Sequence, residues 1–130
     1  MKPLKLLVAL FLSSIVLFVA CKKPTPNSDY LSKADCTVLI DSLNTYNNSI
    51  KAIFNSYCAY SPCHDASTAK KSVVLDSYES SVAAVNKYST KFLCSINQDK
   101  GTVAMPNKLP RLNDSLILKI TCWIKNGMQE

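Results

Sequence analysis

Apolar residues recur every three or four positions along most of the chain, a spacing that predicts amphipathic helices. The clearest run covers residues 42–57, and either Asp41 or Ser42 is placed to cap it. Three more helices are expected: one from Asp76 or Ser77 to about Asn86, one over 90–96, and one from Asn113 or Asp114 to about Asn126. The segment 97–111 contains two prolines and is expected to be mostly loop.

The residues between and within these helices favour an all-α fold. The chain has only two glycines, too few for the many tight turns of a β-sandwich or barrel. One of them, Gly127, follows the last predicted helix, where a helix commonly ends in glycine. Phe54 and Trp123 lie on the apolar faces of the first and last helices, so we expect them to pack these helices together. A buried aromatic side chain removes about 150–250 Å² from water, a large contribution in a small domain.

The N-terminus has the pattern of an export signal. Lys2 and Lys5 precede an apolar run over 6–20, and Cys21 follows directly. The preceding residues FVA resemble the lipobox of bacterial lipoproteins, and this resemblance implies that Cys21 is acylated and becomes the new N-terminus. An uncleaved anchor and an ordinary signal peptide with a chance cysteine are the alternatives. In each case the rest of the chain works outside the cytoplasm, in the cell envelope facing the periplasm or the cell exterior.

Removal of residues 1–20 leaves 110 of the 130 residues, enough for one small domain. Residues 21–35 are polar and contain two prolines, so we interpret them as a lipidated cysteine with a flexible linker. The domain then covers 36–130. The net charge is +6 for the whole chain and +4 without Lys2 and Lys5, and the lysines are scattered. An exported chain without a basic stripe is not expected to bind nucleic acid.

One short segment concentrates the chemistry of the chain. In SYCAYSPCHDA, Cys58 and Cys63 are separated by four residues, and the only histidine, His64, follows directly. Two thiols followed by an imidazole suit covalent haem attachment, in which the thiols add to the two vinyl groups and the imidazole binds the iron. A small disulfide loop is the main alternative. A zinc site would need a fourth ligand from elsewhere, and adjacent residues seldom face each other as nucleophile and base.

A methionine supports the haem interpretation. The iron of low-spin electron carriers takes a sixth ligand, commonly a methionine thioether opposite the histidine. Met105 lies 41 residues after His64, in the proline-containing loop between two predicted helices. The alternative is an ordinary loop or core methionine.

Residues of about 50–128 resemble a class I cytochrome c domain, and in particular small haem lipoproteins of Bacteroidota with a Cys-x4-Cys-His site. The segments that carry the resemblance are IFNSYCAYSPCHDA, VVLDSY, AMPNKLPRL and LILKITCWIKNG, in the order of the family. The resemblance implies three to four helices around one haem c. Cys58 and Cys63 would be the covalent anchors, and His64 and Met105 the axial ligands. The four-residue spacer is longer than the commonest form of the motif.

The remaining cysteines lie outside that pattern. Of six cysteines, Cys21 is assigned to the lipid, which leaves an odd number in an oxidising compartment. Cys94 and Cys122 lie on separate predicted helices and are the expected disulfide, with Cys36 as the competing partner of either one.

The function expected from these observations is electron transfer by a membrane-tethered cytochrome that meets redox partner proteins and is not itself an enzyme. The alternative is a haem-free structural or interaction lipoprotein that keeps Cys58 and Cys63 as a disulfide.

Overall fold

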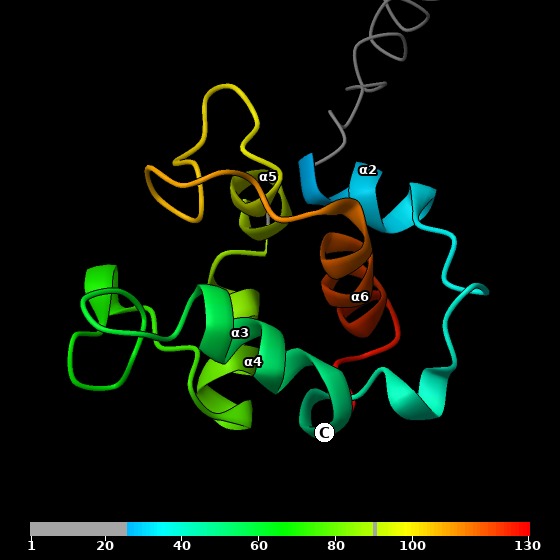
Figure 1. The fold of residues 1–130 in the computed structure, drawn as a ribbon. Helices are drawn as coiled ribbons and strands as arrows, with labels where there is room; N and C mark the ends of the chain where they lie inside the picture. The colour runs from blue at the N-terminus through cyan, green and yellow to red at the C-terminus, as the bar shows by residue number, and fades with distance from the viewer. Residues whose placement is uncertain (1–25, 90) are drawn as a thin grey trace, which may run out of the picture.

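Polar side chains cap the helices of the computed structural model, which describes residues 26–89 and 91–130. Ser77 and Ser80 form a reciprocal capping box at the start of the helix Tyr78–Lys87, and the Asn113 side chain accepts a hydrogen bond from Leu116 N at the start of the last helix. The helices are α2 (Pro26–Lys33), α3 (Lys51–Tyr57), α4 (Tyr78–Lys87), α5 (Phe92–Ile96) and α6 (Asp114–Lys125). Among the described residues there is no strand, so the all-α prediction is confirmed (Figure 1).

The first predicted helix is divided into separate turns. A 3₁₀ turn covers Asp41–Leu43, a π-helical turn covers Tyr46–Ile50, and α3 follows at once. The break occurs at Thr45, whose backbone is extended and whose side chain accepts a hydrogen bond from Asn48 N. Threonine and asparagine side chains compete with the helix for backbone hydrogen bonds, which favours such a break. The prediction of one continuous helix capped at Asp41 or Ser42 was therefore wrong.

The prediction of a flexible linker through residue 35 was also wrong. Pro26–Lys33 forms the helix α2, which packs against both α5 and α6. The Tyr30 hydroxyl lies 2.7 Å from each carboxylate oxygen of Asp99, 69 positions away in the sequence. Asp29 in the first turn and Lys33 in the last turn both complement the helix dipole. The folded domain therefore begins at α2.

Trp123 on α6 joins that helix to the π-helical turn and α3. Its ring centroid lies 6.1 Å from that of Phe54 in an edge-to-face contact and 6.1 Å from that of Tyr46. Such aromatic pairs contribute about 0.5–1.5 kcal/mol each beyond the area that they bury. The expected packing of the Phe54 and Trp123 faces is confirmed. In the described part of the chain, the largest fully buried side chains are Trp123, Tyr46, Phe54, Ile50, Leu93, Ile120, Cys122 and Ser81.

The end of α6 has the geometry expected of a helix that stops at glycine. Gly127 adopts a positive φ of 85°, and its N–H donates to Ile124 O. The N–H of Met128 then donates to Trp123 O at 2.8 Å, which completes a Schellman motif. The predicted role of Gly127 is confirmed, and the motif brings the C-terminal residues back over Trp123.

A disulfide joins Cys36 to Cys122, with their Cα atoms 5.6 Å apart. The prediction of a Cys94–Cys122 bond was therefore wrong. Cys122 is bonded instead to Cys36, the competing partner named above. The reason is the path of the chain after α2: Ala34 O accepts a hydrogen bond from Lys125 Nζ, and Asp41 accepts one from Asn126. These contacts hold the segment that contains Cys36 along α6. Cys94 keeps a free thiol, buried on α5.

Two findings concern the membrane. No helix in the described part of the chain is long and apolar enough to cross a bilayer. The predicted signal peptide and the predicted lipidation site Cys21 lie outside the described residues.

Replacing both Cys36 and Cys122 by alanine should destabilise the domain strongly. The bond closes a loop with a sequence separation of 86, and removing a crosslink of that size costs about 4–5 kcal/mol in chain entropy. Urea unfolding of the double variant measures this loss. Cys94→Ala is the matched control, because it removes a buried sulfur without removing a crosslink. Equal unfolding free energies for the double variant and the control would contradict the disulfide.

Candidate cofactor site

The end of α3 places the first cysteine of the motif. The N–H of Cys58 donates to Phe54 O at 2.8 Å, and the N–H of Ala59 donates to the same carbonyl at 2.7 Å. Phe54 itself is fully buried against Trp123. Cys58 is therefore fixed by the last hydrogen bonds of a helix that is anchored in the core.

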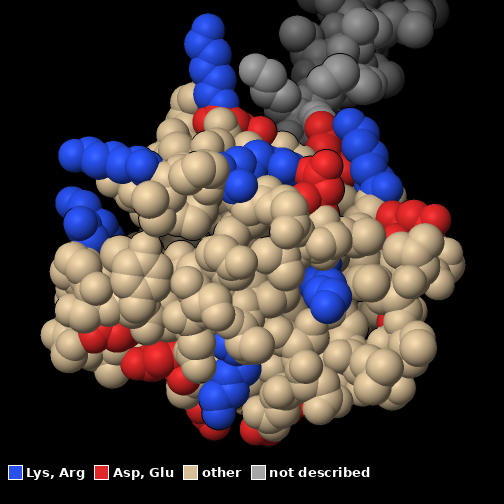
Figure 2. Space-filling view, in the orientation of Figure 1, with Lys and Arg blue, Asp and Glu red and all other residues tan. Residues whose placement is uncertain are grey.

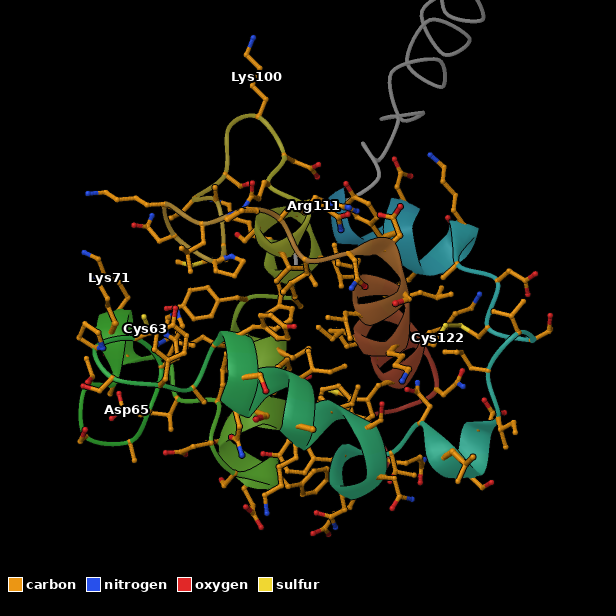
Figure 3. The ribbon with its side chains drawn as sticks, viewed as in Figure 1. Cys63, Asp65, Lys71, Lys100, Arg111 and Cys122 are labelled. Carbon is orange, nitrogen blue, oxygen red and sulfur yellow. A yellow bond between two sulfur atoms is a disulfide. The ribbon has the colours of Figure 1, made fainter. Side chains whose placement is uncertain are left out.

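The residues after Cys58 close into one turn. His64 N donates to Cys58 O at 3.1 Å, and Cys63 N donates to Tyr60 O at 2.6 Å. The four-residue spacer is taken up inside this turn, so the longer motif still brings the histidine backbone next to the first cysteine. The turn leads into the loop that carries Lys71, at one side of the molecule (Figure 3).

The His64 ring is held by a backbone carbonyl. His64 Nδ1 lies 3.3 Å from Val73 O, and the His64 carbonyl accepts a hydrogen bond from Leu75 N at 2.8 Å. A carbonyl oxygen only accepts, so Nδ1 must carry the proton in this contact, and in the neutral ring the lone pair then lies on Nε2. A carbonyl partner of this kind fixes the tautomer and orientation of metal-binding histidines. With Nδ1 engaged in this contact, Nε2 is the ring atom that could bind a metal.

The two cysteines of the turn are both free and half-buried. They are not bonded to each other, although the same chain forms the Cys36–Cys122 bond. Burial, and then the neighbouring Cys63, raises the pKa of the Cys58 thiol to about 12. Two unpaired thiols and a histidine directly after the second are the groups that covalent haem attachment requires.

Met105 lies in the long loop between α5 and α6. Its N–H donates to Ser95 O at 3.0 Å, its side chain packs against the core, and the next residue, Pro106, is buried. Figure 1 shows the later part of this loop, drawn in orange, on the same side of the helices as the Cys58–Ser72 loop. The hydrophobic core has Cys58, Ala59, Val73, Phe92 and Met105 among the partly buried residues packed against it.

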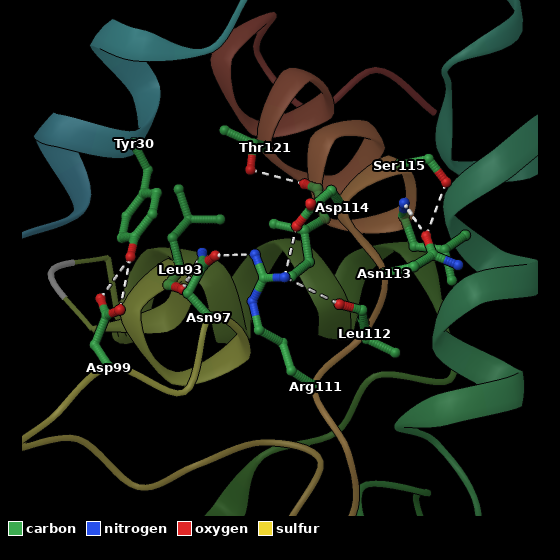
Figure 4. A network of polar contacts seen from close by, with 12 residues as sticks. Tyr30, Leu93, Asn97, Asp99, Arg111, Leu112, Asn113, Asp114, Ser115 and Thr121 are labelled. Carbon is green, nitrogen blue, oxygen red and sulfur yellow. Dashed lines mark hydrogen bonds and ion pairs between the residues drawn. The ribbon is translucent and has the colours of Figure 1, made fainter.

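A polar network holds both ends of the Met105 loop (Figure 4). The Arg111 guanidinium contacts Asp114 at 2.6 Å and donates to Asn97 Oδ1 at 2.8 Å. Asn97 in turn donates to Leu93 O, so the start and the end of the loop are joined near α5. Neither Arg111 nor Asn97 stands out in the sequence, and the partner of His64 is a backbone carbonyl, which has no sequence signal at all.

The other candidate residues lie apart from this turn. Cys94 lines a cavity of about 240 Å³ with Asp29, Tyr30, Lys33 and Asp99. Burial and then the Asp99 carboxylate raise the pKa of its thiol. In the part of the chain that the structure describes, no three His, Cys, Asp or Glu side chains gather into a group that could hold a metal ion.

Comparison of the chain with protein-family models, with curated proteins and with solved structures finds no match. The interpretation of the site consequently depends on its own geometry and chemistry.

The Cys58 thiol should react slowly in the folded protein without haem. The thiolate is the nucleophile, and raising the pKa from 9.0 to about 12 lowers the thiolate fraction at neutral pH by roughly a thousandfold. Timed alkylation with iodoacetamide, read by mass spectrometry of the Cys58 peptide, should be much slower in buffer than in urea. Equal rates in the two solvents would show that Cys58 is not buried as described.

Proposed function

We propose that the chain is a c-type cytochrome with one covalently bound haem, which carries electrons in a bacterial cell envelope. The observation that carries the proposal is the turn at the end of α3. It holds two unpaired thiols and an imidazole whose protonated Nδ1 faces the Val73 carbonyl. A structural disulfide loop would use the two thiols and would give the histidine no particular role.

Four side chains have roles in this proposal. Cys58 and Cys63 would attach the haem through thioether bonds, and His64 Nε2 and the Met105 thioether would bind its iron. When bound, the haem supplies one-electron redox chemistry, with a potential that the axial ligands set. The Val73 carbonyl orients the His64 ring, and the Arg111 network limits the movement of the Met105 loop.

We further propose that the protein is a carrier rather than an enzyme. His64 and Met105 would both bind the haem iron, which would leave no position on it for a substrate or for oxygen. A carrier needs to move only an electron, and rigid ligands keep the two oxidation states similar in structure. Contact with redox partner proteins would be small and transient, as is typical of electron-transfer complexes.

The location is part of the same proposal. Residues 1–20 would direct export, and acylation of Cys21 would hold the protein at a membrane, because each buried methylene of an acyl chain contributes about 0.8 kcal/mol. The domain would face the periplasm or the cell exterior, with no role for nucleic acid.

A haem-free structural or interaction lipoprotein is the second candidate. Trp123, Phe54 and Tyr46 form a connected packed core from the side chains of the chain alone. The Cys36–Cys122 bond adds a crosslink that needs no cofactor.

Production in cells that have a haem-attachment system should give a coloured protein with the sharp reduced α-band of c-type haem. The colour should remain with the chain after denaturing electrophoresis, because thioether bonds survive denaturation. Cys58→Ala with Cys63→Ala should abolish this covalent retention, whereas Cys94→Ala should not change it. A colourless wild-type protein from such cells would support the haem-free candidate instead.

Met105→Leu should lower the reduction potential and allow added imidazole or cyanide to bind the ferric iron. Leucine keeps nearly the same volume but lacks the thioether that raises the potential of His/Met haem. Met128→Leu is the matched control, because Met128 also packs against the core but follows α6 and Gly127, outside the loop that carries Met105. An unchanged potential and spectrum in Met105→Leu would mean that another group is the sixth ligand.

A further inference from the structure

The start of the folded domain lies very close to the predicted lipid anchor. Cys21 precedes Pro26, the first residue of α2, by five positions. Five peptide units span at most about 18 Å when fully extended. A domain of about 100 residues has a radius of gyration near 13 Å, which corresponds to a diameter of roughly 34 Å. Even when fully extended, a connection of five residues therefore spans only about half the diameter of the domain.

The helix at that point is fixed to the rest of the domain. Tyr30 bonds to Asp99 at 2.7 Å, and α2 packs against α5 and α6. Directly after α2, Lys125 Nζ donates to Ala34 O, and the Cys36–Cys122 bond follows. Because α2 cannot swing away from these contacts, the position of its first residue determines which face of the domain stays near the anchor.

The 97–104 loop lies on the same side as the start of α2. The Tyr30–Asp99 bond joins the two segments, and Figure 3 shows Lys100 pointing away from the domain on the side where α2 begins. The apolar side chain of Val103 in this loop is 61% exposed to solvent. The π-helical turn that precedes α3 lies at the opposite end of the molecule (Figure 1).

We infer that the face formed by the start of α2 and the 97–104 loop lies against the lipid bilayer that holds Cys21. This inference rests on the lipid anchor of the proposed function. Basic and acidic side chains are interspersed around this side of the molecule (Figure 2), so the short connection, rather than charge, sets the orientation. Lys100 and Val103 would meet the headgroup region, where a long lysine side chain keeps its charge in water while its stem covers apolar surface.

The orientation also decides how a partner reaches the site. The Cys58–Ser72 loop lies on the side of the helices away from α2 (Figure 1). Lys71, in this loop, is exposed and points outward (Figure 3). The cysteine–histidine turn of the candidate site would therefore face the aqueous phase, and a redox partner could reach it without entering the membrane.

Lysine footprinting of the full lipidated protein tests the inference. The protein is reconstituted in vesicles of phosphatidylethanolamine and phosphatidylglycerol and labelled briefly with a water-soluble amine-reactive ester. Mass spectrometry compares it with the same chain lacking residues 1–21. Lys100 should lose labelling several-fold in the vesicles. Lys51, at the start of α3, and Lys71 should be labelled equally in both samples.

A variant with thirty Gly/Ser residues inserted before Pro26 separates the effect of the short connection from direct affinity for lipid. A flexible insert of that length spans roughly 30 Å, enough to release the domain. Lys100 labelling should then return to the value of the unanchored chain. Continued protection would overturn the inference that the connection sets the orientation.

The failures of the two proposals are distinguishable. Absence of acyl chains on Cys21, measured by the mass of the intact protein, would overturn both the lipid anchor and this inference. An acylated protein in which Lys100 and Lys51 are labelled equally would overturn this inference alone and leave the haem proposal unaffected.

Discussion

The contact of Trp123 with Phe54 and Tyr46 is the interaction on which the rest of the domain depends. It joins α6 to the π-helical turn and α3, and hydrogen bonds with the C-terminal residues reinforce it. The carbonyl of Gln129 accepts hydrogen bonds from both Trp123 Nε1 at 2.8 Å and Tyr46 N at 2.9 Å. Because α3 is held there, its last turn delivers Cys58 to a defined place. The candidate site is thus built outward from the aromatic core.

The loops that carry the candidate ligands are irregular, but backbone hydrogen bonds hold them at particular residues. Backbone hydrogen bonds connect Leu75 N to His64 O and Met105 N to Ser95 O. Ala69, Lys71 and Ser72 adopt positive φ angles between these points, conformations that cost free energy for residues other than glycine. The fold therefore maintains an unfavourable loop backbone next to the cysteine–histidine turn, while the aromatic core and the disulfide supply the stability.

Local signals in the sequence predicted the local features well. Ser77 and Asn113 cap the helices where their types and the following apolar pattern placed them, and Gly127 ends α6. The errors concern contacts between distant residues. α2 was not predicted, because residues 22–35 are polar and the hydrogen bond that holds the helix joins Tyr30 to Asp99, 69 positions away. Without α2, nothing in the sequence placed Cys36 beside Cys122. For the site, the Cys58–His64 turn was evident, but its carbonyl partner was not.

The disulfide also determines how the protein would bear a mechanical load. Cys58, Cys63, His64 and Met105 all lie between Cys36 and Cys122, inside one covalent ring. A pull on the chain from its N-terminal side reaches Cys36 and crosses through the disulfide to α6, so it cannot draw out the segment between the two cysteines. A load applied at the N-terminal side of the chain would therefore pass through α2, the disulfide and α6, outside the segment that carries the cysteine–histidine turn.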